Sequence, residues 1–339
     1  MYASQEDITQ IYLAAVEDEL QDAVKSANAC GNTLLQDMLA YHMGWLGKPI
    51  SSEARGKRIR PLLVLLTCSA AGGDWEQALP AATAVELVHN FSLIHDDIED
   101  KSPLRRGRPT VWKKWGIPQA INAGDAMLTI AHLQLLHLSE KLTHSATLLA
   151  IEILQQACLH LTQGQYLDLS YEMRQDVTLD EYWFMIKEKT ATLISASTEL
   201  GALSAFCDDQ ICKSYRDFGC NLGLAFQVQD DLLGIWGDSA FTGKSNKSDL
   251  LTGKKTLPVL YGLYKSGKFA KRWNQGPVHL QELEELIHIL EADGAKEFTQ
   301  AKANELISQA LHDLDEAHPT GTASQVLKNL ALNLIHRQI

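Results

Sequence analysis

Residues 77–97 read QALPAATAVELVHNFSLIHDD, an apolar stretch that ends in two adjacent aspartates. Its apolar side chains recur at steps of three and four residues, the spacing of one face of an α-helix. Because nearly all faces are apolar, we expect this helix to be buried. Carboxylates at the end of a buried helix are costly unless a cation compensates their charge. The stretch therefore predicts both a helical core and a cation-binding end.

The same helical spacing runs through most of the 339 residues, and the alternation typical of strands is nearly absent. Three further long helices are predicted at 8–24, 145–169 and 179–206. No low-complexity linker divides the chain, so we expect an all-α protein that forms one domain, residues 1–339. We predict loops at 103–111, 237–255 and 265–280.

The overall charge is acidic, with a formal net charge of -12 and 45% hydrophobic residues. This balance argues against a nucleic-acid partner. No apolar run is long enough for a stable membrane insertion, and the N-terminus does not read as a signal peptide, so we expect a cytoplasmic protein. No cysteine pair has zinc-site spacing, and we expect reduced thiols at all six positions. These are Cys30, Cys68, Cys158, Cys207, Cys212 and Cys220.

Two acidic clusters lie at the ends of apolar stretches that are predicted to be helical. Asp96 and Asp100 share a helix face, and Asp97 lies on the adjacent one. Asp230 and Asp231 follow a second apolar stretch. If the two clusters faced each other, they would suit Mg²⁺, which joins carboxylates to substrate phosphates. Calcium is the weaker alternative, since no EF-hand spacing is present.

Basic residues accompany both clusters. Arginine suits bidentate phosphate recognition and lysine supplies point charges. The basic residues are Lys57, Arg58, Arg60, Arg105, Arg106, Arg108, Lys244, Lys247, Lys254 and Lys255. Each run alone reads equally well as a solvated loop. Carboxylates that can bind a metal and basic residues that can bind an anion occur together in this helical protein. The combination indicates a polyanionic ligand that is bound through a metal ion, and a diphosphate is the simplest candidate.

Five ordered motifs carry a family resemblance: HDDIED, RRGRPTVW, GDAML, FQVQDD and GKKTLP. In this order they resemble the trans-type isoprenyl diphosphate synthases, from about Gly56 to Pro258. The resemblance implies a homodimeric bundle of long antiparallel helices around a central active-site cavity. It also implies condensation of isopentenyl diphosphate with an allylic diphosphate (dimethylallyl, geranyl or farnesyl), with two or three Mg²⁺ ions per site.

The resemblance assigns roles residue by residue. Metal ligands would be Asp96, Asp97, Asp100, Asp230 and Asp231. The allylic diphosphate would be held by Arg105, Lys189, Lys244 and Lys254. Isopentenyl diphosphate would be held by Lys57, Arg60, His89 and Arg106. Thr190 and Gln227 would line the reacting region, and Gln165 and Asp168 match a motif close to it.

Two positions depart from the family pattern. Gly234 stands where many members have a third aspartate of the second motif, so we expect weaker support for one Mg²⁺. Asp238, four residues later, is the candidate substitute. Arg55 stands where a glycine is common, which could shift a backbone turn.

Product length should depend on the helix before Asp96. Phe91 lies about 7.5 Å back along the helix axis, where a ring can form a cavity floor beside the small Ser92. Phe91 also reads as an ordinary core residue, and His89 as a buried core histidine. The pair resembles enzymes with short products, which favours geranylgeranyl diphosphate, with farnesyl diphosphate next.

Three alternative functions remain at this point. A class I terpene cyclase shares the cation chemistry but has no use for a second diphosphate pocket. A non-catalytic partner subunit commonly loses the aspartate-rich motif, which is intact here. An acidic helical scaffold leaves the ordered basic residues unexplained.

Overall fold

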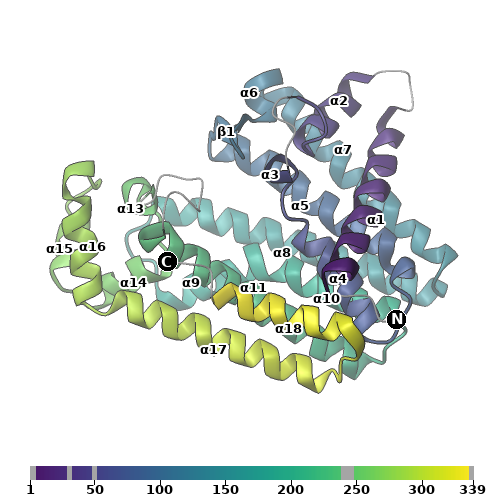
Figure 1. Cartoon of the computed structure of the whole chain (residues 1–339). Coiled ribbons are helices and arrows are strands. Elements are labelled where there is room, and N and C mark those ends of the chain that lie inside the picture. Colours follow the sequence, from purple (N-terminus) through teal and green to yellow (C-terminus); the bar gives the residue numbers. More distant parts are fainter. Residues whose placement is uncertain (1–4, 29–32, 48–51, 238–247, 336–339) are drawn as a thin grey trace. The chain divides into compact units, whose positions relative to one another are not determined.

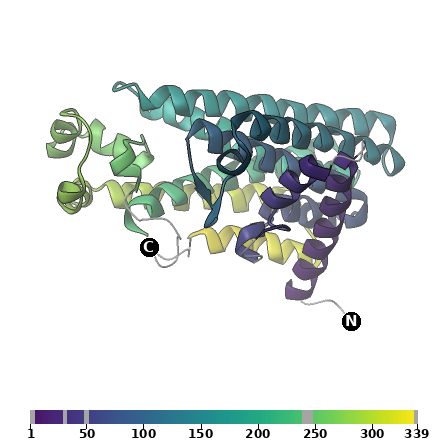
Figure 2. The same ribbon diagram turned by 90° about the horizontal axis from the view of Figure 1, so that it is seen from above.

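The computed structural model describes residues 5–28, 33–47, 52–237 and 248–335. Nearly all of these residues are helical in both views (Figure 1, Figure 2). The all-α expectation is therefore confirmed. The chain forms two compact units: unit 1 comprises Met1–Gln156, Ala196–Arg216 and Ala317–Leu327, and unit 2 comprises Ala157–Ser195, Asp217–Glu316 and Lys328–Ile339. The prediction of a single domain stays a prediction.

Unit 1 begins with the N-terminal helices and includes a short hairpin. Its elements are α1 (Gln5–Lys25), η1 (Ser26–Asn28), α2 (Thr33–His42), α3 (Ser52–Arg55), α4 (Ile59–Ala70), η2 (Trp75–Ala78), α5 (Leu79–Glu99), β1 (Leu104–Arg105), β2 (Arg108–Pro109), α6 (Val111–Trp115), α7 (Ile117–Leu136) and η3 (His137–Glu140). Helix α5 packs along α7. Gly124 of α7 permits this approach, because a Cβ there would lie 2.2 Å from Nε2 of His95.

Unit 2 contains α9 (Leu179–Ile186), the π-helical turn η4 (Lys187–Ala191), α13 (Ser248–Thr252), α14 (Leu257–Tyr264), α15 (Lys268–Trp273), η5 (Leu280–Glu282), α16 (Leu283–Ala292) and α17 (Ala295–Glu316). Four helices contribute residues to both units: α8 (His144–Glu172), α10 (Thr192–Ser204), α11 (Asp209–Trp236) and α18 (Gly321–Ile335). One core cluster of unit 2 gathers Ile235, Leu250, Val259 and Phe269, and a second gathers Tyr182, Val228 and Leu257.

The predicted helices agree closely with α1, α5 and α8, but the fourth does not remain regular. The π-helical turn η4 interrupts it between α9 and α10. Two glycines make room for this turn. A Cβ on Gly164 would lie 2.2 Å from the backbone nitrogen of Lys189, and one on Gly223 would lie 2.6 Å from Cα of Ala191.

All three loop predictions are wrong in part. Residues 237–255 contain α13 (Ser248–Thr252), and residues 238–247 of this stretch lie outside the described residues. Residues 103–111 contain the antiparallel pair β1 and β2, because Arg106 and Gly107 both adopt positive φ (51° and 73°), as in a type I′ hairpin turn. Residues 265–280 contain α15, which buries Phe269 completely. Burial of this ring stabilises α15, which we did not predict because most residues around Phe269 in the sequence are polar.

Candidate active site

The first aspartate cluster lies at the C-terminal end of α5, within unit 1. Asp96 is partly buried and Asp100, the C-cap residue, is exposed. The backbone nitrogen of Asp100 donates to the carbonyl of Asp96 at 2.8 Å, so the helical register extends to this position. The two carboxylates therefore lie one turn apart on the same face of the helix.

Asp97 has a different environment from its neighbour. Its side chain is 2% exposed and accepts hydrogen bonds from Nε of Arg105 at 2.9 Å, with Nη2 also at 2.9 Å. Burial raises the pKa of Asp97, while the Arg105 guanidinium opposes that shift. Asp97 thus orients Arg105, whereas Asp96 and Asp100 present the more accessible carboxylates.

The hairpin turn aims Arg106 at the loop before α4. Arg106 donates from Nη1 to the carbonyl oxygen of Ala54 at 3.2 Å. Gly56 makes the approach possible, because a Cβ there would lie 2.6 Å from Nη2 of Arg106. With φ of +83°, Gly56 also adopts a backbone conformation that favours glycine.

Arg60 and His89 meet in the same region. Nη1 of Arg60 donates to Nε2 of His89 at 3.2 Å. Burial, with Arg60 and Arg106 nearby, holds the pKa of His89 well below its ordinary value, so the ring is neutral and can accept this bond. Lys57 is exposed close by in the sequence.

A small pocket in unit 1 is lined by several of these groups. Among its lining residues are His42, Ala54, Asp97, Arg105 and Arg106. Burial, followed by Arg105, Arg106 and Arg58, lowers the pKa of His42 far below its ordinary value. The excess of guanidinium groups over carboxylates makes the pocket suited to an anion.

Arg58, which the sequence grouped with the phosphate-binding bases, belongs elsewhere. Its guanidinium pairs with Glu17 at 3.2 Å and Glu86 at 2.8 Å and is nearly inaccessible. The neighbouring departure, Arg55, lies 3.9 Å from Glu17, and its side chain is 44% exposed. It leaves the positive φ of Gly56 intact.

Phe91 and Ser92 are both buried on α5. The Phe91 ring packs edge-on against His95, with centroids 5.5 Å apart. Ser92 donates to the carbonyl of His89 at 2.8 Å, which turns its hydroxyl back onto the helix. Two rings one turn apart therefore precede Asp96.

The second aspartate cluster, in unit 2, repeats the division of the first. Asp231 is 4% exposed and accepts from the Tyr182 hydroxyl (2.6 Å), Gln227 Nε2 (2.9 Å) and the Leu257 backbone nitrogen (2.9 Å). Burial raises the pKa of Asp231 to about 7, against the opposing effect of these hydrogen bonds. Asp230 is partly exposed. Asp231 therefore anchors the cluster, and Asp230 is its more accessible member.

Gly234, the departure in the second motif, is closely covered. A Cβ there would lie 2.2 Å from Oδ2 of Asp249, so a side chain at 234 has no room while that carboxylate keeps its place. Asp238, the substitute considered from the sequence, lies outside the described residues.

The π-helical turn carries Lys189 and Thr190. Lys189 pairs with Asp168, and both side chains are 28% exposed. Thr190 donates to Oε1 of Gln227 at 2.8 Å, and Gln227 in turn donates to Asp231. This chain of contacts ties η4 to the second aspartate cluster.

The remaining predicted residues differ in their setting. Gln165 is buried on α8, and Lys254 is exposed after α13. Lys244 lies outside the described residues. Sequence reasoning missed Tyr182 and His42, because neither belongs to a charged run.

The carboxylates fit a hard divalent cation. In the described part of the chain, no three His, Cys, Asp or Glu side chains cluster so as to hold a metal by themselves. Asp96 and Asp100 offer oxygen donors from one helix face, and Mg²⁺ commonly takes one or two carboxylates and completes its shell with water and phosphate. This donor set therefore suits an ion that binds together with substrate.

Known proteins resemble this chain over most of its length. The profile of the family described as polyprenyl synthetase matches residues 43–290. A (2E,6E)-farnesyl diphosphate synthase of Mycobacterium tuberculosis is 38% identical over 315 residues, which cover 90% of this chain and 86% of that protein. The chain belongs to the polyprenyl synthetase family.

Other members of the polyprenyl synthetase family are similar to this chain over most of its length. A geranylgeranyl diphosphate synthase of M. tuberculosis is 40% identical over 290 residues, covering 84% of this chain and 82% of that protein. The crystal structure of a polyprenyl synthetase from Streptomyces coelicolor has a TM-score of 0.86 and 33% identity, and the match covers 96% of this chain and 98% of that one. The chain is thus a prenyltransferase with the all-α fold of these enzymes.

The described residues include no helix long and apolar enough to cross a bilayer. Five cysteines of the chain lie in the described part, and all five are free thiols, as expected: Cys68, Cys158, Cys207, Cys212 and Cys220. Cys30 lies outside the described residues.

Proposed function

We propose that this prenyltransferase condenses isopentenyl diphosphate with an allylic diphosphate and makes a short trans-prenyl diphosphate. The observation that carries the proposal is the cluster in unit 1, where Arg60, His89 and Arg106 lie near the loop bearing Lys57, and Arg105 is oriented by Asp97. A cluster of cations beside the Asp96 and Asp100 carboxylates suits two diphosphate groups.

In this proposal the isopentenyl diphosphate is bound by Lys57, Arg60, His89 and Arg106. Arg105, Lys189, Lys244 and Lys254 bind the allylic diphosphate. The metal ligands are Asp96, Asp97, Asp100, Asp230 and Asp231. Asp96, Asp100 and Asp230 are the more accessible of these carboxylates, whereas Asp97 and Asp231 are buried.

The chemistry begins with ionisation of the allylic diphosphate. The C–O bond breaks, and its electrons leave with the diphosphate while an allylic cation remains. Arg105 and Lys189 stabilise the departing negative charge, and bound Mg²⁺ supplies further electrostatic stabilisation of the diphosphate oxygens.

The double bond of isopentenyl diphosphate then attacks the cation and forms the new C–C bond. A proton leaves the adjacent carbon, and the released diphosphate is the base that accepts it. Thr190 and Gln227, bonded to each other, offer polar groups in this region. Water must be excluded, since it would trap the cation.

Phe91 sets the product length in this account, and geranylgeranyl diphosphate is the expected product, with farnesyl diphosphate next. The buried ring and its contact with His95 support a floor at this depth of α5. We further propose that the enzyme acts as a homodimer in the cytoplasm.

Product analysis tests the proposal. The protein is incubated with Mg²⁺, labelled isopentenyl diphosphate and dimethylallyl, geranyl or farnesyl diphosphate in turn, and the alcohols are separated after dephosphorylation. We expect a labelled twenty-carbon alcohol. A fifteen-carbon or longer alcohol would keep the reaction and refute the product length, and no incorporation from any primer would refute the reaction.

A further inference from the structure

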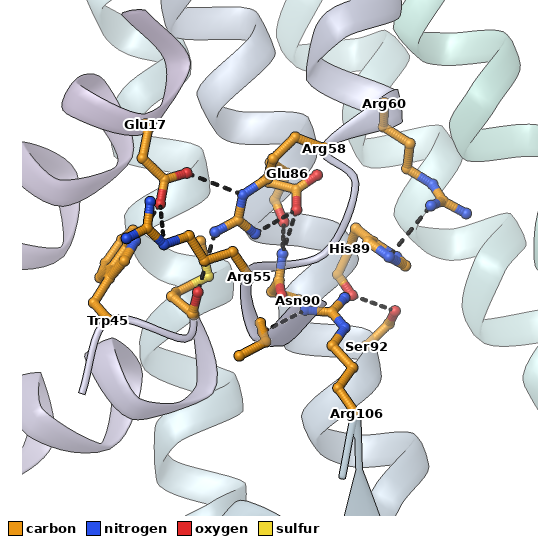
Figure 3. A network of polar contacts seen from close by, with 12 residues as sticks. Glu17, Trp45, Arg55, Arg58, Arg60, Glu86, His89, Asn90, Ser92 and Arg106 are labelled. Carbon is orange, nitrogen blue, oxygen red and sulfur yellow. Dashed lines mark hydrogen bonds and ion pairs between the residues drawn. The ribbon is translucent and has the colours of Figure 1, made fainter. Parts of the chain in front are cut away.

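A buried ion-pair network surrounds Arg58 in unit 1 (Figure 3). Each nitrogen of the guanidinium has an acceptor: Nε contacts Oε2 of Glu17 at 3.2 Å, Nη1 contacts Oε1 of Glu86 at 2.8 Å, and Nη2 contacts the carbonyl of Met43 at 3.2 Å. The side chains of Arg58 and Glu86 are both 4% exposed. With an acceptor at each nitrogen and almost no exposed surface, this guanidinium is not accessible to a diphosphate ligand.

The acceptors are themselves held in place. Asn90, one turn after Glu86 on α5, donates to both the carboxylate and the carbonyl of Glu86 at 2.8 Å. The indole of Trp45 donates to the other oxygen of Glu17, on α1. The network therefore joins α1, the segment after α2, the loop before α4, and α5.

Arg58 also fixes an unusual backbone position. Its φ and ψ are 48° and 37°, the left-handed conformation, at the N-cap residue that immediately precedes α4. This conformation is rare for residues other than glycine, asparagine and aspartate, and at Arg58 it coincides with side-chain contacts from all three guanidinium nitrogens. Lys57 precedes Arg58, and Arg60 follows two residues later.

The consequence is visible at Arg60. Figure 3 shows Arg60 directed toward His89, while Arg58 points away into the network. Glu86, His89 and Asn90 lie within little more than one turn of α5. The same short segment of α5 thus contacts the loop before α4 at two points: Glu86 binds Arg58, and His89 accepts a hydrogen bond from Arg60 at the start of α4.

We propose that Glu17, Arg58 and Glu86 are positioning residues, which fix the loop so that Lys57 and Arg60 meet isopentenyl diphosphate. This inference rests on the proposed function. None of the three touches the substrate in this account. They act through the left-handed turn at Arg58, which sets the direction of the residues on both sides.

A purely structural role predicts something different. Buried ion pairs are weak contributors to stability by themselves, although removal of one partner is destabilising. A structural defect would affect both substrates alike. Loss of positioning would raise the KM for isopentenyl diphosphate and spare the KM for the allylic substrate.

The chain offers a matched control. Arg55 contacts the same Glu17 but is 44% exposed, whereas the Arg58 side chain is 4% exposed. We would compare Arg58→Met with Arg55→Met, and measure the KM for each substrate and the thermal shift caused by isopentenyl diphosphate alone. For Arg58→Met we expect the KM for isopentenyl diphosphate to rise about tenfold, equivalent to about 1.4 kcal/mol of binding, with the allylic KM within about twofold. Arg55→Met should leave the KM values for both substrates unchanged.

Two further variants guard against misfolding. Arg58→Met/Glu86→Gln removes the charge of the buried Glu86 together with that of Arg58, while Glu17 keeps its hydrogen bond from the Trp45 indole. Glu17→Gln keeps a hydrogen-bonding side chain of the same shape. Both should raise the KM for isopentenyl diphosphate selectively. Equal changes for both substrates, or unchanged KM values in a folded variant, would overturn the inference. A parent protein that incorporates no isopentenyl diphosphate would instead refute the proposed function.

Discussion

Adjacent aspartates in this chain have different environments. In each cluster the second carboxylate is buried and bonded to protein donors, Arg105 for Asp97 and Tyr182 for Asp231, and the first is more accessible. A sequence of two identical residues conceals this division. It follows from helix geometry, because successive residues point about 100° apart and only one of them faces the packed interior.

Asp96→Asn and Asp97→Asn should therefore differ in kind. Asp97→Asn removes a charged acceptor from Arg105, so we expect it to lower the free energy of unfolding by about 1–3 kcal/mol. Asp96→Asn should lower kcat by about 100-fold or more, with a smaller effect on stability. Urea unfolding and steady-state rates of both variants would check this. Identical profiles for the two would contradict the division.

The neutral histidines predict how stability depends on pH. The pKa values of His42 and His89 are both lowered, so the unfolded chain binds more protons than the folded one below about pH 6.5. Stability should fall as the pH decreases from 6.5, by up to about 1.4 kcal/mol per pH unit for each ring. His89→Gln should reduce this slope in urea unfolding, and His312→Gln, at an exposed site, is the control. An unchanged slope in His89→Gln would refute this assignment.

At the scale of elements, glycines decide which helices approach closely. Gly164→Ala should separate α8 from η4, because the new methyl group would lie 2.2 Å from a backbone atom of Lys189. We expect a loss of about 1–3 kcal/mol in unfolding free energy and an increased KM for the allylic substrate. Gly267→Ala is the control, since its nearest neighbour would lie at 3.5 Å. Equal behaviour of the two variants would show that α8 and η4 can shift freely.

Helix α5 should act as a ruler for the growing chain. Phe91 lies five residues before Asp96, so its ring stands about 7.5 Å back along the axis. Phe91→Ala should lengthen the main product by at least one five-carbon unit, as measured by chromatography of the alcohols. Phe91→Leu, which keeps much of the volume, should change it less. The parent product distribution in Phe91→Ala would remove Phe91 from this role.

At the scale of the whole molecule, the sequence predicts what depends on periodicity. Helices α1, α5 and α8 follow from apolar spacing, and local burial then fixes their limits within a few residues. The π-helical turn and the hairpin could not be predicted in this way. The first depends on glycines in α8 and α11, and the second on positive φ at Arg106, a residue type that rarely adopts it.

The candidate site shows the same limit. Ordered motifs predict the diphosphate-binding residues, since each motif is local in sequence. The partners of Arg58 are not local: Glu17 lies 41 positions earlier and Glu86 lies 28 later. Only the folded chain shows that one arginine of the run KRIR is buried in an ion-pair network, whereas Lys57 is exposed and Arg60 is partly exposed.

The proposed reaction joins two diphosphate substrates. The most direct measurement is the stoichiometry of the reaction with farnesyl diphosphate and labelled isopentenyl diphosphate, counting label incorporated and inorganic diphosphate released. We expect one inorganic diphosphate released for each labelled unit incorporated, and no release without isopentenyl diphosphate. Release from farnesyl diphosphate alone, with no label incorporated, would contradict it and indicate cyclisation.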